Sequence, residues 1–67
     1  MIYVNGQPTA GMENATISEL LRGLDIDPET AGIAVAVDAE IARRGAWPTH
    51  TLPDGARVEI VTATQGG

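Results

Sequence analysis

The chain contains no cysteine among its 67 residues. It therefore forms no disulfide, offers no thiol nucleophile or thiolate metal ligand, and carries no persulfide of its own. Lysine is also absent, since the four basic residues are all arginines. If the C-terminal carboxylate were activated as an acyl derivative, no side-chain amine could capture it. Chains of self-conjugates on lysine are thus excluded, and only the N-terminal amine remains.

Phenylalanine is the third missing residue type, and one tryptophan and one tyrosine are the whole aromatic content. The core must therefore be aliphatic, built from 15 Val, Ile and Leu residues and ten Ala. A chain of 67 residues makes one small domain. At that size a core gives only about 3–5 kcal/mol of net stability without disulfides or metals. We expect a single domain of marginal stability.

Positive charge is scarce, because nine acidic residues oppose four arginines and the net charge is −5 at pH 7. Nucleic acid is a poor partner for such a chain, and an anionic membrane surface is disfavoured for the same reason. No segment approaches the roughly 20 apolar residues that span a bilayer, and the N-terminus lacks the basic region of a signal peptide. We expect a cytoplasmic protein without nucleic-acid or membrane partners.

No group of residues in the sequence forms a recognisable catalytic or metal-binding pattern. His50 has no second histidine or cysteine near it. There is no glycine-rich phosphate loop followed by Lys-Ser/Thr and no nucleophile paired with a base. Arg43-Arg44 is expected to form solvated surface rather than an anion site, and Trp47 to close the core. The sequence thus predicts no catalytic residue of its own, no metal and no bound cofactor.

A hairpin is predicted at the N-terminus. Residues 2–4 read as a strand, and Asn5-Gly6 favours a tight turn because both of its central residues need φ > 0. Residues 7–12 would form the return strand, with Pro8 near its start, where a missing N–H is tolerated.

A helix is predicted to begin at Thr16, since Thr16 and Glu19 have the spacing of a capping box. One apolar stripe follows at i, i+3, i+4 and i+7. Its members are Ile17, Leu20, Leu21 and Leu24. Asp25, Asp27 and Pro28 would terminate the helix and open a polar loop.

The most continuous apolar run, residues 32–37, predicts a central strand with two unlike faces. The larger residues at 33, 35 and 37 would meet the helix stripe. Ala34 and Ala36 would face outward beside Val61, and we predict there a shallow apolar patch on which partners dock. The alternative is a sheet face covered by loops. A turn at residues 38–39 and a short edge strand at 40–42 should follow.

The last ten residues combine a strand with a glycine terminus. A turn at Pro53-Asp54-Gly55 leads into residues 58–61, which alternate in the period of a strand. From Thr64 onward no large apolar group is available for burial, and four extended residues reach roughly 13 Å. Gly-Gly lets another protein close around the backbone. The plain alternative is a fraying end without a role.

The element order predicts an α+β fold, with a mixed sheet of four to five strands and one main helix on one face. With the terminal Gly-Gly, this order resembles the ubiquitin-like β-grasp fold. Residues 1–63 would form the β-grasp domain and residues 64–67 a flexible C-terminal tail.

Several local features narrow the resemblance to the ThiS family, the sulfur carrier proteins of thiamine biosynthesis. They are the run 31–38, the Arg44-x-x-Trp47 spacing, the Asp-Gly turn at 54–55 and the Gln-Gly-Gly end at 65–67. The resemblance covers essentially the whole chain, although the first thirty residues match only by pattern. One departure is Ala42-Arg43, where the family often has a proline before the arginine.

The resemblance implies a protein cosubstrate, not an enzyme. A ThiF-like adenylyltransferase would use ATP to convert the Gly67 carboxylate to an acyl-adenylate. Sulfur from a persulfide on a sulfur donor protein would then give a thiocarboxylate. A ThiG-like thiazole synthase would use that sulfur for the thiazole ring of thiamine. Gln65 and Gly66 would thread into the partner's active site.

Other classes of protein share the glycine end. The small subunit of molybdopterin synthase has the same fold, but its members tend to be longer and richer in Phe. A ubiquitin-like protein modifier would form isopeptide bonds. A plain interaction module would leave the glycines idle, and an enzyme acting alone fits least.

Overall fold

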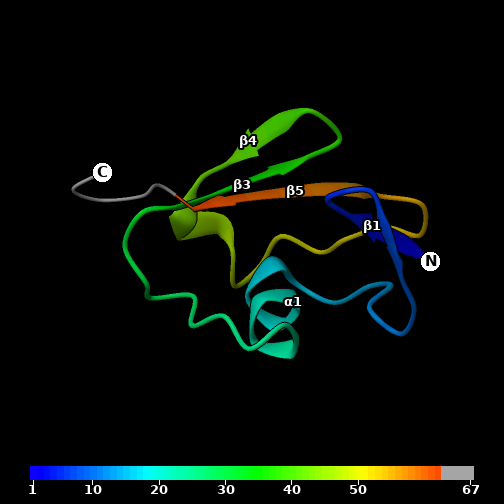
Figure 1. Cartoon of the computed structure of the whole chain (residues 1–67), viewed down its shortest axis with the longest axis horizontal. Coiled ribbons are helices and arrows are strands. Elements are labelled where there is room, and N and C mark those ends of the chain that lie inside the picture. Colours follow the sequence, from blue (N-terminus) through cyan, green and yellow to red (C-terminus); the bar gives the residue numbers. More distant parts are fainter. Residues whose placement is uncertain (63–67) are drawn as a thin grey trace.

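A five-stranded mixed sheet with one α-helix packed against one face forms the structure, a computed structural model that describes residues 1–62 (Figure 1). Ala63 and the predicted tail at 64–67 lie outside the described residues. The strands are β1 (Ile2–Val4), β2 (Gln7–Thr9), β3 (Ile33–Val37), β4 (Glu40–Ala42) and β5 (Arg57–Thr62). Their order is β2-β1-β5-β3-β4, and only β1 and β5 run parallel. The predicted mixed sheet with one main helix is confirmed.

Both predicted hairpin turns are present. Asn5 and Gly6 have φ of 50° and 83°, and Asp38 and Ala39 have φ of 50° and 72°. Positive φ at both central residues gives the turn twist that suits a right-handed strand pair. The return strand β2 is shorter than predicted, because it ends at Thr9 rather than residue 12. Its proline is tolerated because β2 lies at a sheet edge.

The capping box at the start of helix α1 (Ile17–Gly23) is confirmed. The Glu19 N–H donates to the Thr16 hydroxyl at 3.1 Å, and the Thr16 N–H donates to the Glu19 carboxylate at 2.8 Å. The prediction for Leu24 is wrong: it is the C-cap rather than part of the stripe, and it is 38% exposed. The next residue, Asp25, has φ of 61°, so the chain turns away before Leu24 can face the sheet.

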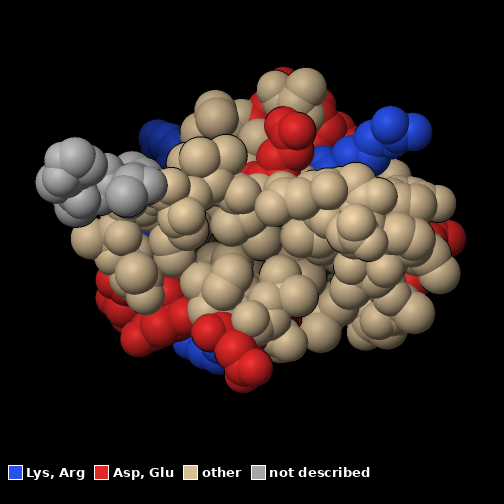
Figure 2. All heavy atoms as spheres, in the orientation of Figure 1, with Lys and Arg blue, Asp and Glu red and all other residues tan. Residues whose placement is uncertain are grey.

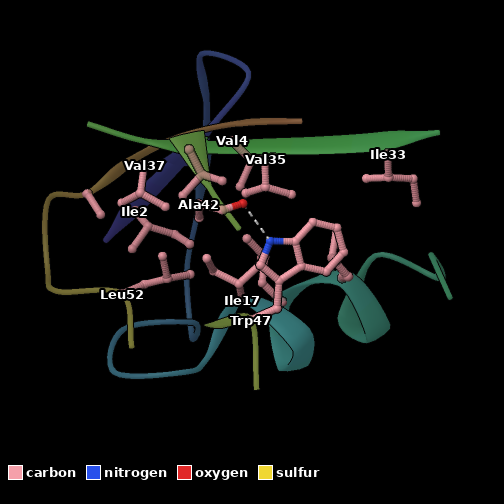
Figure 3. Close-up of a cluster of buried hydrophobic side chains, with 13 residues drawn as sticks. Ile2, Val4, Ile17, Ile33, Val35, Val37, Ala42, Trp47 and Leu52 are labelled. Carbon is pink, nitrogen blue, oxygen red and sulfur yellow. Dashed lines mark hydrogen bonds between the residues drawn. The ribbon is translucent and has the colours of Figure 1, made fainter. Parts of the chain in front are cut away.

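The core lies between the inner face of the sheet and α1 (Figure 3). Ile33, Val35 and Val37 point into it, as predicted, and Trp47 closes it with only 2% of its surface exposed. The Trp47 indole N–H donates to the carbonyl of Ala42 at 3.0 Å, so the one buried aromatic ring has its polar atom satisfied. A short 3₁₀ helix, η1 (Arg44–Ala46), brings Trp47 under the sheet from β4.

Helices in the described part of the chain are too short and too polar to cross a bilayer.

Candidate functional site

Strand β5, which leads toward the C-terminus, occupies the middle of the sheet. It runs parallel to β1 on one side and pairs with β3 over five Cα partners on the other, from Val37 and Val58 to Ile33 and Thr62. The predicted alternation holds, since Val58 is buried and Ile60 is half-buried, whereas Glu59 and Val61 are exposed.

The side chain of Asn5 adds a second attachment to β5. The Ile60 N–H donates to Asn5 Oδ1 at 2.8 Å, and Asn5 Nδ2 donates to the Ile60 carbonyl at 3.2 Å. The backbone N–H of Asn5 also donates to the Val58 carbonyl at 2.8 Å. Sequence reasoning recognised Asn5 only as a turn residue, because nothing local indicates a bond to a strand 55 positions away. Strand β5 is thus held on both sides as far as Ile60, and its last two residues pair with β3.

The three residues predicted to carry or thread the reacting terminus are Gln65, Gly66 and Gly67. They lie outside the described residues. The structure describes the point from which they continue: Thr62, the last residue of β5, opposite Ile33 at the start of β3.

The residues predicted to form the docking patch do lie together. Ala34 and Val61 are Cα partners, and Ala36 is two positions along β3 on the same face. Val61 is 61% exposed, Ala34 is exposed and Ala36 is half-buried. Within residues 1–62, therefore, no loop covers this face as the alternative required.

Ile41 extends the patch, although it was not among the residues predicted to form it. It is the Cα partner of Ala36 on edge strand β4 and is 74% exposed, more than any other large apolar residue in the described range. The alternation Glu-Ile-Ala with an inward Ala42 is the sequence signal that could have placed Ile41 outward. We call Ala34, Ala36, Ile41 and Val61 the outer apolar face.

Charged and uncharged side chains are unevenly distributed over the molecular surface. In the view of Figure 2, acidic side chains gather at the upper and lower margins, with a broad uncharged surface between them. On the outer face of β5, Glu59 is the Cα partner of Ala36, and Arg57 points outward from the end of the strand opposite Thr62. Both residues line an open groove of about 710 Å³ with Tyr3 and Asp38. The groove therefore adjoins the outer apolar face at Glu59 and lies toward the end of the sheet away from Thr62.

Arg44, the second of the two adjacent arginines, is held by contacts within the chain. Arg44 is exposed, as predicted, but its guanidinium is engaged: Nη1 donates to the carbonyl of Pro28, and Nη2 donates to the carbonyl of Thr30 at 2.8 Å. The guanidinium also lies over the Trp47 ring, 4.5 Å from its centroid. The prediction of plain solvated surface missed these contacts, since their partners lie 14 and 16 positions away.

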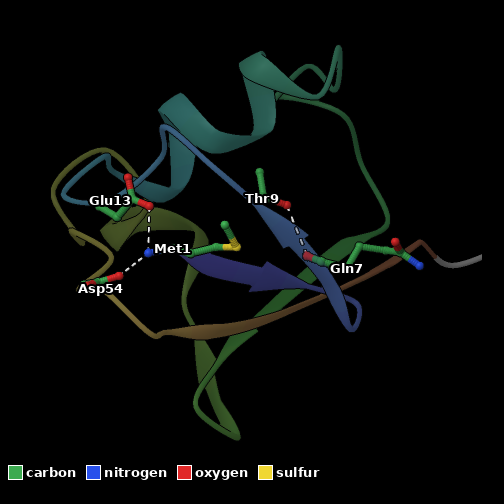
Figure 4. A network of polar contacts seen from close by, with 5 residues as sticks. All are labelled: Met1, Gln7, Thr9, Glu13 and Asp54. Atoms are coloured by element: carbon green, nitrogen blue, oxygen red, sulfur yellow. Dashed lines mark hydrogen bonds and ion pairs between the residues drawn. The ribbon is translucent and has the colours of Figure 1, made fainter.

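The N-terminal ammonium group lies between two carboxylates (Figure 4). It forms ion pairs with Glu13, at 2.8 Å, and with Asp54. Hydrogen bonds to Asp54 and Glu13 raise the pKa of the amine, and the bond to the amine lowers the pKa of each carboxyl group. Because β1 is parallel to β5 and starts beside Arg57, this amine sits at the end of the sheet opposite Thr62.

Across residues 1–62, no three His, Asp or Glu side chains are arranged to hold a metal ion.

Comparison with known proteins gives one consistent result. The model of the ThiS family matches residues 2–67. The sulfur carrier protein ThiS of Thermus thermophilus is 34% identical over 67 residues, which cover 100% of both chains. The sulfur carrier protein ThiS of Escherichia coli is 32% identical over 66 residues, covering 98% of this chain and 97% of the relative.

Solved structures agree in fold. The crystal structure of the thiamine biosynthesis protein (ThiS) from Geobacter metallireducens superposes with a TM-score of 0.78 at 29% identity, covering 98% of this chain and 97% of the other. A solution structure of a thiamine biosynthesis protein from the same organism gives 0.76 at 31% identity, covering 98% and 86%. The predicted ubiquitin-like β-grasp fold is confirmed by this similarity.

Proposed function

Since this chain belongs to the ThiS family, we propose that it carries sulfur as a thiocarboxylate on Gly67. The family and the names of its relatives give the coarser statement directly: the chain is a sulfur carrier of thiamine biosynthesis, and it acts with other proteins of that pathway. A carrier of this kind is a cosubstrate that is consumed and regenerated, not a catalyst.

The proposed chemistry begins with activation, because a free carboxylate is a poor electrophile. A ThiF-like adenylyltransferase joins the Gly67 carboxylate oxygen to the α-phosphorus of ATP and releases pyrophosphate. The terminal sulfur of a persulfide, supplied by a sulfur donor protein, then attacks the acyl carbon and expels AMP. The product is an acyl disulfide between Gly67 and the donor. A thiol then attacks the donor's sulfur, forms a disulfide with it and releases the Gly67 thiocarboxylate. ATP and the persulfide are thus substrates of the partner proteins rather than ligands of this chain. We propose that the reaction takes place in the cytoplasm.

The arrangement of β5 supports this proposal. The strand is bonded on both sides as far as Ile60, by β1, β3 and the Asn5 side chain, and its last two residues pair with β3. The domain thus provides a folded base for the tail. The five residues that follow reach about 17 Å when fully extended. That length allows Gly67 to enter a partner's active site while the domain stays at its entrance. The absence of cysteine agrees with a chain that carries sulfur on its terminus.

We further propose that the outer apolar face is the docking surface for the ThiF-like enzyme and for a ThiG-like thiazole synthase. Val61 belongs to the same strand as the root of the tail, and Ala34 lies opposite it. A partner that covers this face is therefore adjacent to the residues that it must thread. Small alanine side chains leave the surface shallow, which suits close packing of a partner's apolar side chains.

Family membership together with the terminal Gly-Gly is the observation that carries the proposal. The test is high-resolution mass spectrometry of the C-terminal peptide after incubation with ATP, a persulfide source and a ThiF-like enzyme. Intact mass is insufficient, because exchange of oxygen for sulfur nearly equals oxidation of Met1 or Met12. We expect sulfur on Gly67. An adenylate or amide without sulfur would indicate a protein modifier, and an unchanged Gly67 would contradict activation altogether.

A further inference from the structure

Arg44 connects two parts of the chain that lie far apart in the sequence. Its guanidinium donates to the carbonyls of Pro28 and Thr30, in the loop between α1 and β3. On its other side it lies over the Trp47 ring. Two further hydrogen bonds of this loop, from the N–H groups of Thr30 and Glu29 to Asp27, are local. Arg44 therefore ties the loop to the core.

This connection lies at one particular end of the sheet. β5 ends at Thr62, and β3 begins at its partner Ile33, only three positions after Thr30. β4 runs antiparallel to β3 and ends at Ala42, so η1 also lies at that end (Figure 1). The loop that Arg44 holds thus leads directly into the residue that pairs with the root of the tail.

The support for Arg44 is rigid. Trp47 is 2% exposed, its indole N–H donates to Ala42, and its carbonyl accepts from the Ser18 N–H of α1 at 3.2 Å. A planar guanidinium that meets two carbonyls and one ring face has few alternative positions. The Pro28 side of the contact is fixed too, since Pro28 is itself buried.

We infer that Arg44 is a positioning residue for sulfur loading: by holding residues 28–30 it fixes Ile33, and through Ile33 the place at which Thr62 delivers the tail to a partner. The inference rests on the proposed function. It follows from the geometry because a strand end that frays moves everything beyond it. A displacement of about 1 Å of a reacting group can cost on the order of 100-fold in rate.

Arg43 supplies a matched control. It precedes Arg44, is exposed, has an extended backbone with φ of −69°, and makes no side-chain cap to η1. Arg43→Ala and Arg44→Ala remove the same charge from neighbouring positions, but only the second removes the connection to Pro28 and Thr30. Arg44→Lys keeps a cation near Trp47 and loses the two-carbonyl geometry, so it should be intermediate.

The experiment has two readouts. In steady-state loading by a ThiF-like enzyme, Arg44→Ala should lower kcat at least tenfold with KM within twofold, because the outer apolar face is unchanged. Arg43→Ala should stay within twofold of the original chain in both. In hydrogen exchange of the free protein, Arg44→Ala should accelerate the amides of Ala34 and Val61, which pair at that end of the sheet, while that of Val58 keeps its protection.

Each contrary outcome identifies its cause. Equal kcat for the two alanine variants, or unchanged exchange in Arg44→Ala, overturns the inference. A change confined to KM would mean that Arg44 contacts the partner directly, which also overturns it. If the original chain is not loaded at all, the proposed function fails, and hydrogen exchange, which needs no partner, still decides whether Arg44 orders the strand end. Should Arg44→Ala not fold, Arg44→Lys gives the same comparison.

Discussion

Ala34 on β3 and Val61 on β5 are Cα partners whose side chains both lie on the exposed face of the sheet. The next pair in the ladder, Val35 and Ile60, faces α1 instead. A slip of one residue in this register would exchange the two faces. Burial of Val35 therefore fixes both the core and the outer apolar face beside the root of the tail.

Val61→Asp should weaken binding to the activating enzyme at least tenfold, because a carboxylate would be desolvated within an apolar contact. The fold should persist, since Val61 is 61% exposed. Leu24→Asp is the control: it makes the same change at an exposed apolar residue of the helix layer. Calorimetric titration of both variants checks the prediction, and equal affinities would remove Val61 from the docking surface.

Gly66→Val should block thiocarboxylate formation without changing the thermal unfolding of the domain. A β-branched side chain prevents close approach of a partner to the backbone and restricts φ and ψ. Gly66→Ala, with a single methyl group, should retain more activity. The amount of sulfur on Gly67 after a fixed incubation measures the effect, and normal loading of the valine variant would show that backbone clearance is not required.

Trp47→Phe should lower the free energy of unfolding by about 1–3 kcal/mol. The smaller ring leaves a cavity, and the Ala42 carbonyl loses its indole donor. The control is Tyr3→Phe, a change at an aromatic ring that is 38% exposed, which should stay within about 0.5 kcal/mol. Urea unfolding followed by circular dichroism compares them. Similar midpoints for the two variants would contradict the role of Trp47 in the core.

Stability should depend on pH through the N-terminal ion pairs. The lowered carboxyl pKa values of Glu13 and Asp54 mean that their contribution is present above the ordinary carboxyl range and is lost as pH falls through the folded values. The raised pKa of the Met1 amine means that its contribution is complete below the ordinary value of 8.0 and is lost as pH rises through the folded value.

The measurement is the melting temperature from pH 2 to 11 for the original chain and for a Glu13→Gln, Asp54→Asn double variant. The difference should be greatest between the two titrations and shrink at both ends and in high salt, since Met1 and Asp54 are exposed and Glu13 is only half-buried. Glu29→Gln with Glu40→Gln is the charge-matched control. A difference that does not vary with pH would show that the ion pairs contribute nothing.

The sequence by itself determined the local features. Thr16 and Glu19 form a capping box within one helical turn, Asn5-Gly6 tolerates the positive φ of a hairpin, and the alternation of residues 33–37 separates a helix face from an outer face. Each of these depends on groups a few positions apart, whose geometry the residue types themselves restrict. The Gly-Gly terminus is likewise read directly from the sequence, and with the family resemblance it predicts Gly67 as the residue that carries sulfur.

Only the tertiary structure decided which distant segments meet. It inserted β5 between β1 and β3, placed Asn5 against Ile60, and brought Arg44 to the carbonyls of Pro28 and Thr30. It also turned Leu24 out of the core. The contacts of Asn5 and Arg44 are hydrogen bonds to backbone groups, which nearly every residue offers. The residue types therefore do not indicate which backbone group becomes the partner. The choice depends on the packing of the whole core, and that packing is a property of the folded chain rather than of any stretch of its sequence.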